Sequence, residues 1–531
     1  MSTVGAADFT VVVAAPEGDW EPALRGLARH VPQAAAVVVV TCGREPRGAG
    51  VRVARTAPGA AGAACLAAAR AARTPYVAFL QGRDEVLPGW PAHLARAAAD
   101  HAGLIEYGCL RLRPEDPIAP PDGDVHLDLD LEVGAEYRRN GDRTDVSRSG
   151  DPLGGLIDGI VLPSLAPGGA PVAYAVRRDL LELREDSAEG AVQASRVTVP
   201  RLLVRRRSDD SAAAGAAALA VRAHVLRTTR LSSRVTEPDL EPPRPGRAPE
   251  LVSVVLPVRD GARTLPAQLD ALARQTYDRP WEVVVVDNGS TDGTREVAEA
   301  ARSALPALRV VDAADRAGES HARNRGIRAA RGDLIAFCDA DDVAAAGWLA
   351  ALAGAAPDAG LIGGSLDTAL LSPSHPDEQP LPMTAQTDFL PFARGANCAA
   401  WTEVLNAIGG WDESYVGGGE DMDLSWRARL SHHRVGYAPD ARMHYRLRAE
   451  LSSLARQKWN YGRSGARLYD AYRHAGFQRR DGGTVLMNWS WLLLHSPDLA
   501  RSPGLRRRWV RYGARLAGFL AGSVEQGVAY L

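Results

Sequence analysis

Lysine is almost missing from this 531-residue sequence: Lys458 is the only one among 62 basic side chains. Because alanine and glycine are abundant, we attribute the arginine usage to the codon bias of a GC-rich genome; arginine selected for phosphate recognition is the alternative. The formal net charge is only −2. A chain so close to neutral has no general attraction to nucleic acid, so no nucleic-acid partner is expected.

Cysteine is also scarce, and its five positions show no paired spacing. This excludes a disulfide scaffold and a cysteine-based zinc site, and indicates free thiols in a reducing compartment. The N-terminus shows no basic segment followed by an apolar run, and no stretch reaches about 18 apolar residues. We therefore expect a cytoplasmic protein, with peripheral contact at the inner face of the membrane as the alternative.

Prolines gather in residues 237–250, where they favour an extended spacer over a helix or a central strand. The total length also exceeds one ordinary domain. We predict four parts: a domain at 1–236, the linker at 237–250, a second domain at 251–450 and a helical extension at 451–531.

Apolar, β-branched runs alternate with alanine-rich helical segments after the linker. Continuous apolar strands separated by helices indicate a mostly parallel sheet, buried on both faces. The first half repeats the pattern, so the predicted fold class is α/β, with two Rossmann-like domains and a helical C-terminal segment. The predicted strands are 9–15, 36–40, 76–80, 252–258, 281–286, 308–312 and 334–338.

The two halves align most closely over residues 74–90 and 332–348, which match without gaps. We interpret this as an internal repeat of domain size. Gln81 and Arg83 then stand where the second half has Asp339 and Asp341. Because a guanidinium repels a cation, the first half is predicted to lack a metal site and to serve as scaffold, dimerisation surface or acceptor-binding domain.

Acidic residues follow the predicted strand 334–338 in the run Asp339-Ala-Asp341-Asp342. In extended backbone, residues two apart share a face, so we expect Asp339 and Asp341 together and Asp342 opposed. Two carboxylates at the open end of a parallel sheet suit a hard divalent cation. The similar Asp128-Leu-Asp130 lies in strict apolar–polar alternation and is interpreted as a solvated strand face.

Other motifs surround this acidic run, and each has an ordinary explanation when taken alone. The segment 287–293 is a glycine-containing turn, 322–326 a cationic helical face, and 417–421 a flexible loop followed by helix-capping acids. A lone histidine such as His444 is more often structural than a ligand.

Taken in order, these segments resemble the inverting family 2 glycosyltransferases of the GT-A type. The resemblance spans about 200 residues and rests on Ser253-Val-Val-Leu-Pro-Val258, Val286-Asp-Asn-Gly-Ser-Thr-Asp-Gly-Thr294, Ala322-Arg-Asn-Arg-Gly326, Asp339-Ala-Asp-Asp342, Gly409-Gly-Trp-Asp-Glu413 and Gly418-Gly-Glu-Asp421. It implies a nucleotide-sugar donor, of which a UDP-sugar is the expected kind, an acceptor with a free hydroxyl, and Mn²⁺ or Mg²⁺ as cofactor.

The resemblance also implies a role for each matching residue. Asp421 would be the catalytic base, with Glu420 beside it shaping the acceptor side. The nucleotide-sugar would be bound by Pro257, Asp287, Arg323 and Asp339. The metal would be held by Asp339, Asp341 and, in relatives that use it, His444. The acceptor side would include Asn397, Trp411 and Gly419.

Two other functions remain open: a nucleotidyltransferase, and a catalytically silent scaffold that binds nucleotide-sugars. The run 255–260 lacks the glycine- and lysine-rich character expected of a triphosphate-binding loop, which disfavours the first. For the helical extension, packing on the catalytic half is the preferred interpretation and interfacial membrane contact the alternative. A homodimer is a further expected partner arrangement.

Overall fold

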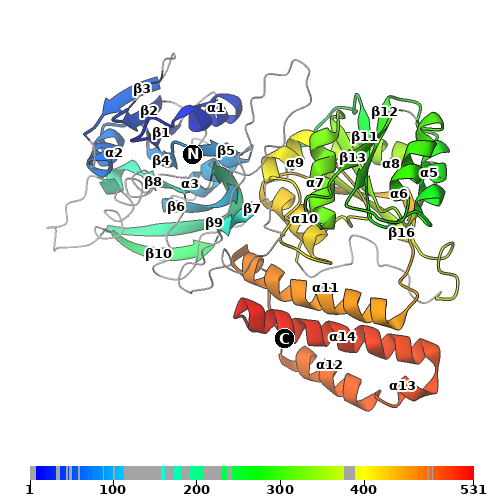
Figure 1. Cartoon of the computed structure of the whole chain (residues 1–531). Helices are drawn as coiled ribbons and strands as arrows, with labels where there is room; N and C mark the ends of the chain where they lie inside the picture. Colours follow the sequence, from blue (N-terminus) through cyan, green and yellow to red (C-terminus); the bar gives the residue numbers. More distant parts are fainter. Residues whose placement is uncertain are drawn as a thin grey trace.

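A computed structural model contains two α/β units and a group of C-terminal helices (Figure 1). It describes residues 8–31, 36–43, 46, 51–57, 60–87, 89–99, 102–112, 157–161, 173–181, 192–207, 229–235, 242–305, 307–375, 389–475, 477–480 and 482–530. The predicted fold class is confirmed. Asp128 and Asp130, and the first part of the proline-rich linker, lie outside the described residues.

The second unit is built on a sheet in which eight described strands follow the order β13-β12-β11-β14-β17-β16-β18-β15. The four predicted strands form its parallel part. β17 is antiparallel to both of its neighbours, so the sheet is mixed beyond β14. The strands are β11 (Val252–Val258), β12 (Trp281–Asp287), β13 (Leu308–Asp312), β14 (Leu334–Cys338), β15 (Val343–Ala344), β16 (Leu361–Asp367), β17 (Asn397–Trp401) and β18 (Val435–His444).

Helices connect these strands, and their apolar sides share one core with the sheet. They are α5 (Leu265–Ala273), α6 (Thr294–Ala300), α7 (Glu319–Ala329), α8 (Trp348–Ala355), α9 (Thr402–Ile408) and α10 (Glu420–Leu430). Both β11 and β14 are buried along their whole length, which explains their continuous apolar sequences. Pro257 fits in central β11 because pairing with β14 ends at Val255.

The first unit carries a ten-stranded sheet, again among described residues, in which β1 lies between β4 and β2. Alternate residues of β1 belong to two separate hydrophobic clusters, so helices and loops cover both faces. The strands are β1 (Phe9–Ala14), β2 (Ala36–Thr41), β3 (Val51–Arg55), β4 (Tyr76–Gln81), β5 (Asp84–Val86), β6 (Ala102–Leu112), β7 (Ile157–Val161), β8 (Ala173–Arg177), β9 (Val192–Arg207) and β10 (Thr229–Val235). The helices are α1 (Glu21–His30), α2 (Ala61–Arg70) and α3 (Trp90–Ala99).

The two sheets share one topology over eight strands. The order β3-β2-β1-β4-β8-β6-β9-β5 of the first unit corresponds to β13-β12-β11-β14-β17-β16-β18-β15 of the second. The sense of pairing agrees at each step: for example, β4 is antiparallel to β8 as β14 is to β17. Glu85 pairs with Arg205 as Val343 pairs with His444, so Arg205 occupies the register position of His444. This agreement supports the internal repeat.

The C-terminal helices are α11 (Leu451–Tyr472), α12 (Gly482–Leu494), α13 (Asp498–Arg501) and α14 (Pro503–Gln526). Glycines let α11 and α14 approach closely. A Cβ on Gly462 would lie 2.1 Å from the Arg515 carbonyl oxygen, and one on Gly518 would lie 2.1 Å from that of Trp459. Within the described residues, no helix combines the length and apolar character needed to cross a membrane.

Histidines form part of the contact between the two α/β units. His93 of α3 is fully buried, and its Nε2 lies 3.1 Å from Nδ1 of His432, which follows α10. Gly89 leaves room for His432, because a Cβ there would approach the histidine Cβ to 2.4 Å. The first unit therefore packs directly against the end of α10, the helix that begins at Glu420.

Candidate active site at the ends of β12 and β14

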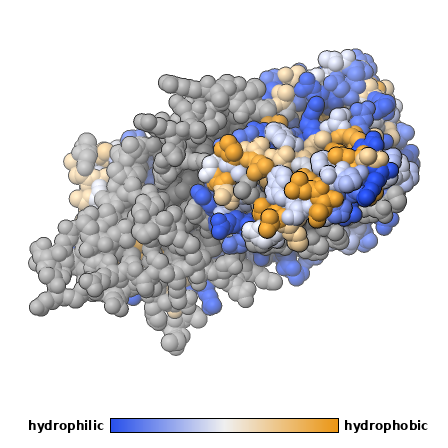
Figure 2. All heavy atoms as spheres, turned by 90° about the horizontal axis from the view of Figure 1, so that it is seen from below, coloured by the Kyte–Doolittle hydropathy of each residue, from blue (hydrophilic) through white to orange (hydrophobic). Residues whose placement is uncertain are grey.

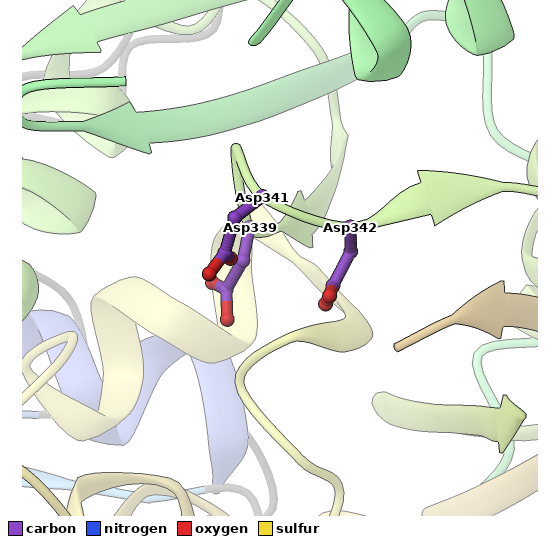
Figure 3. A group of neighbouring side chains, drawn as sticks. All are labelled: Asp339, Asp341 and Asp342. Carbon is purple, nitrogen blue, oxygen red and sulfur yellow. The ribbon is translucent and has the colours of Figure 1, made fainter. Parts of the chain in front are cut away.

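Three aspartates form an acidic group directly after β14. Residues 339–342 make a turn and do not continue the strand, so Asp339, Asp341 and Asp342 point the same way (Figure 3). Their nearest ligand oxygens all lie within 4.8 Å of one another. The expectation that Asp342 opposes the other two is therefore wrong, because it assumed extended backbone where the chain turns.

Only part of the negative charge in this group is compensated by neighbouring cations. Arg448 Nη1 lies 3.2 Å from Asp341 Oδ2, and the Arg446 backbone N–H donates to Asp342 Oδ1 at 2.8 Å. Burial, together with the charge of Glu319, raises the pKa of Asp339 to about 7. Burial and the neighbouring Asp339 also raise the pKa of Asp342 well above its usual range.

A divalent cation fits this group of carboxylates. Hard oxygen ligands are what Mg²⁺ and Mn²⁺ prefer, and a cation would relieve the repulsion among the acids. Asp342 Oδ2 is buried without a hydrogen-bond partner, which leaves one oxygen able to accept a further ligand interaction.

Arg323 of α7 joins the acidic group to the other side of the site. Its guanidinium is buried, donates to Glu319 and Asp339 (3.1 Å to Oδ1), and lies 3.8 Å from Glu420 Oε1. It stacks over the Trp411 ring at 4.4 Å. These carboxylates raise its pKa despite the opposing effect of burial, so the side chain stays charged.

Glu420 and Asp421 begin α10 after three consecutive glycines with positive φ angles of 76°, 145° and 95°. These backbone angles favour glycine at 417–419 and turn the chain so that the helix starts beside Arg323. Burial and the neighbouring Asp421 raise the pKa of Glu420 to about 8. Burial also raises the pKa of Asp421. The backbone N–H of the next residue, Met422, donates a hydrogen bond to Asp421 Oδ1 at 2.9 Å.

Asp287 ends β12 and organises the glycine-containing turn that follows. Its Oδ1 accepts from the Ser290 N–H at 2.9 Å, while Oδ2 has only Arg295 at 4.0 Å. Asn288 holds the same turn through donation to the carbonyls of Ala313 and Arg316. Oδ1 of Asp287 therefore stabilises the turn, whereas Oδ2 faces only the guanidinium of Arg295.

Three further predicted site residues have clear packing environments. Asn397 is fully buried: its amide donates to Ser365 and Ala441 and accepts from Trp348, so it ties the sheet together. Trp411 is fully buried as the platform under Arg323. His444 lies outside the group of three acids, with its Nδ1 3.5 Å from Asp367 Oδ2. Gly419 remains at the start of α10.

Several residues close to the site were not anticipated. Glu319 was not predicted because it lies before the motif that contains Arg323. Burial lowers the pKa of Arg394, and the negative charge of Asp421 opposes this shift. On α11, the Tyr461 ring lies against Gly418, where an added Cβ would meet Cδ1 at 2.4 Å. Neither Arg394 nor Tyr461 stands in a motif, so only tertiary structure reveals them.

Comparisons with known proteins agree with the motif order. The family model described as glycosyl transferase family 2 matches residues 253–379. A glycosyltransferase named AglE from Haloferax volcanii is 29% identical over 190 residues, which are 34% of this chain and 61% of that protein. The pre-mycofactocin glycosyltransferase of Mycobacterium tuberculosis is 29% identical over 250 residues, 44% of this chain and 50% of that protein.

Among solved structures, a mannosyltransferase from Pyrobaculum calidifontis in complex with GDP-Man and Mn²⁺ covers 54% of this chain and 90% of its own. Its sequence identity is 21% and its TM-score 0.40, a likeness too low to carry an argument. The chain spans less than two thirds of the length of the two relatives named above. Residues 253–379, with the motifs and the sheet around them, are therefore similar to glycosyl transferase family 2.

Proposed function

We propose that this protein transfers a sugar from a nucleotide-sugar to an acceptor hydroxyl, by metal-assisted direct displacement with inversion. The observation that carries the proposal is the position of Arg323, which contacts Asp339 on the metal side and approaches Glu420 on the acceptor side. A UDP-sugar is the donor that the family resemblance implies.

Electrostatics supports the metal in this proposal. Glu319, Glu420 and Asp421 join the three aspartates around the buried Arg323, so an anionic diphosphate would meet more carboxyl groups than cations. Asp339, Asp341 and Asp342 would hold the cation. When bound, Mn²⁺ or Mg²⁺ would supply Lewis-acid stabilisation of the departing diphosphate.

Asp421 is the proposed general base. It would take the proton of the acceptor hydroxyl as that oxygen attacks the anomeric carbon, while the bond to the diphosphate breaks. Its raised pKa brings it nearer to the range in which a base is useful at neutral pH. Arg323 would stabilise the negative charge that develops on the diphosphate.

For the first unit we propose a sheet of the same kind that has lost its metal site. Arg83, at the position of Asp341, has its guanidinium 2.6 Å from Asp19 Oδ2. Asp84, at the position of Asp342, is fully buried and accepts from the Gln81 N–H at 2.9 Å. Structural support of the catalytic half, through contacts such as His93 with His432, is its proposed role.

A donor screen tests the proposed function. Thermal shift in Mn²⁺ across a panel of UDP-, GDP- and dTDP-sugars should select one donor, with UDP-sugars favoured. Proton NMR of the product formed from that donor should then show the opposite anomeric configuration. Retention would refute direct displacement, whereas pyrophosphate release from a nucleoside triphosphate and sugar phosphate would favour a nucleotidyltransferase.

A further inference from the structure

Helix α12 presents an apolar face to the outside of the molecule. Its sequence, GGTVLMNWSWLLL, contains no charged residue. Leu486, Met487, Leu493 and Leu494 are 65–77% exposed, although a surface helix normally turns polar residues outward. At 100° per residue these four positions fall within an arc of about 120° on one side of the helix.

The opposite side of α12 is already engaged. Leu492 is buried in a cluster with Leu516 and Phe519 of α14, and the Trp509 indole of α14 donates to the Leu492 carbonyl at 2.9 Å. The exposed leucines are therefore on the side of α12 that faces away from the core. Seen from below, apolar side chains lie together on this part of the molecule, beside polar ones (Figure 2).

Arginines accompany this apolar face. Residues 482–530 contain six arginines and two acids, a formal charge of +4 in a chain whose total is −2. Arg508 lies over the Trp491 ring at 5.3 Å, and Trp491 packs against Tyr512 at 4.9 Å. Aromatic rings and arginines beside exposed leucines are the composition of helices that lie in a membrane interface.

We propose that α12, with the arginines of α14, docks this protein on a lipid bilayer that carries anionic headgroups. The leucines would enter the boundary of the acyl chains, and Arg506 and Arg508 would meet the headgroups. A second copy of the chain is the less favourable occupant, because a two-fold contact at this face would bring two clusters of positive charge together.

Docking would also set the orientation of the active site. α14 packs on α11 through glycines, and α11 in turn contacts the glycine loop before Glu420. The bilayer-facing helices and the proposed catalytic base are therefore linked through a single helix, α11.

Vesicle flotation of the full-length protein tests the proposal. We expect binding to vesicles of phosphatidylcholine mixed with phosphatidylglycerol, weaker binding to phosphatidylcholine alone, and release by high salt. The triple variant Leu486→Ser/Leu493→Ser/Leu494→Ser should bind at least about tenfold more weakly, since each buried methylene contributes to partitioning. Leu370→Ser, which changes a leucine that is 59% exposed and follows β16, outside the C-terminal helices, should bind like the parent.

The double variant Arg506→Gln/Arg508→Gln separates the charge contribution from the apolar one. It should bind the anionic vesicles roughly tenfold more weakly and lose much of the salt dependence. Failure of the parent to bind either vesicle would overturn the proposal, as would equal binding by the triple leucine variant. A parent that forms a dimer in light scattering, converted to monomer by the leucine changes and indifferent to vesicles, would establish self-association in its place.

Discussion

At the scale of single residues, Arg323 connects the parts of the site. It shares its guanidinium among Glu319, Asp339 and Glu420, stacks on Trp411, and leaves space only for glycine at 395, where a Cβ would come within 2.8 Å of Nη2. The site thus holds more carboxylates than cations.

Replacing the proposed base should separate chemistry from binding. Asp421→Asn should leave donor affinity unchanged and lower turnover by roughly a hundredfold or more. In the parent, turnover should rise with pH through a pKa above that of an ordinary aspartate, because burial raises the pKa of Asp421. Steady-state kinetics and calorimetry check this, with the exposed Asp440→Asn as the control. Near-normal turnover in Asp421→Asn would move the assignment elsewhere.

Glu420 should make the ligand-free protein less stable as pH rises. Its pKa is about 8 in the folded state against 4.5 as the ordinary value. The folded state therefore favours the protonated form, and that stabilisation is present below about pH 4.5 and lost as pH rises towards 8. Glu420→Gln should melt several degrees above the parent at about pH 8 and equal it near pH 4.5. Parallel melting curves at all pH values would contradict the burial of this carboxyl.

Sequence motifs predicted which of these residues to consider, but not all of their geometry. Asp339 and Asp341 were expected at the site because parallel strands end at one edge of a sheet, whereas Arg323 and Asp421 were placed there by the family resemblance. Asp342 was misplaced because alternation holds only in extended backbone. The motifs do not reveal that other elements bury the side chains of Asn397 and Trp411.

At the scale of elements, the glycine loop depends on α11. A Cβ on Gly417 would meet Asn460 at 2.3 Å, and one on Gly418 would meet the Tyr461 ring. Arg467 donates to the Ser414 carbonyl at 3.0 Å and lies over the Tyr415 ring. A helix remote in sequence therefore holds the loop that carries Glu420 and Asp421.

Gly418→Ala should disturb this contact. We expect a loss of roughly 1–3 kcal/mol in stability, from strained backbone and the clash with Tyr461, and a fall in turnover. Gly347→Ala is the matched control, because nothing lies within 4 Å of its added Cβ. Adding Tyr461→Ala to Gly418→Ala should restore part of the turnover. If the double variant is no better than the single one, the ring is not what positions the loop.

Strand prediction succeeded where burial on both faces left a continuous apolar signal, as in β11 and β14. It did not identify β16, which begins with Leu-Ile-Gly-Gly. Its pairing with β17 and β18 joins segments distant in sequence, and a short glycine-containing run gives no periodic signal. The antiparallel part of the sheet was therefore not anticipated.

At the scale of the whole molecule, two sheets of one topology meet at a cluster of histidines. Burial, with the nearby charges of His432 and His30, lowers the pKa of His433 to about 4. Because the folded state disfavours the charged ring, this histidine contributes stability at pH values above 6.5, its ordinary pKa. That contribution is lost as the pH falls towards 4. The protein should therefore lose thermal stability over that interval.

His433→Leu should flatten this acid dependence. The variant removes the titrating ring, and its Nε2 is buried without a hydrogen-bond partner, so little else is lost. Melting temperatures measured from about pH 7 to 4 should fall less in the variant than in the parent. An equal fall in both would assign the acid sensitivity to other groups.

Calorimetric titration of UDP in the presence of Mn²⁺ tests whether the second unit alone binds the nucleotide. Asp339 and Asp341 should provide one nucleotide site per chain, because Gln81 and Arg83 replace them in the first unit. Asp341→Ala should abolish Mn²⁺-dependent binding, and Arg83→Ala should leave it nearly unchanged. Two equivalent sites per chain, or Mn²⁺-dependent binding that survives Asp341→Ala, would contradict the account.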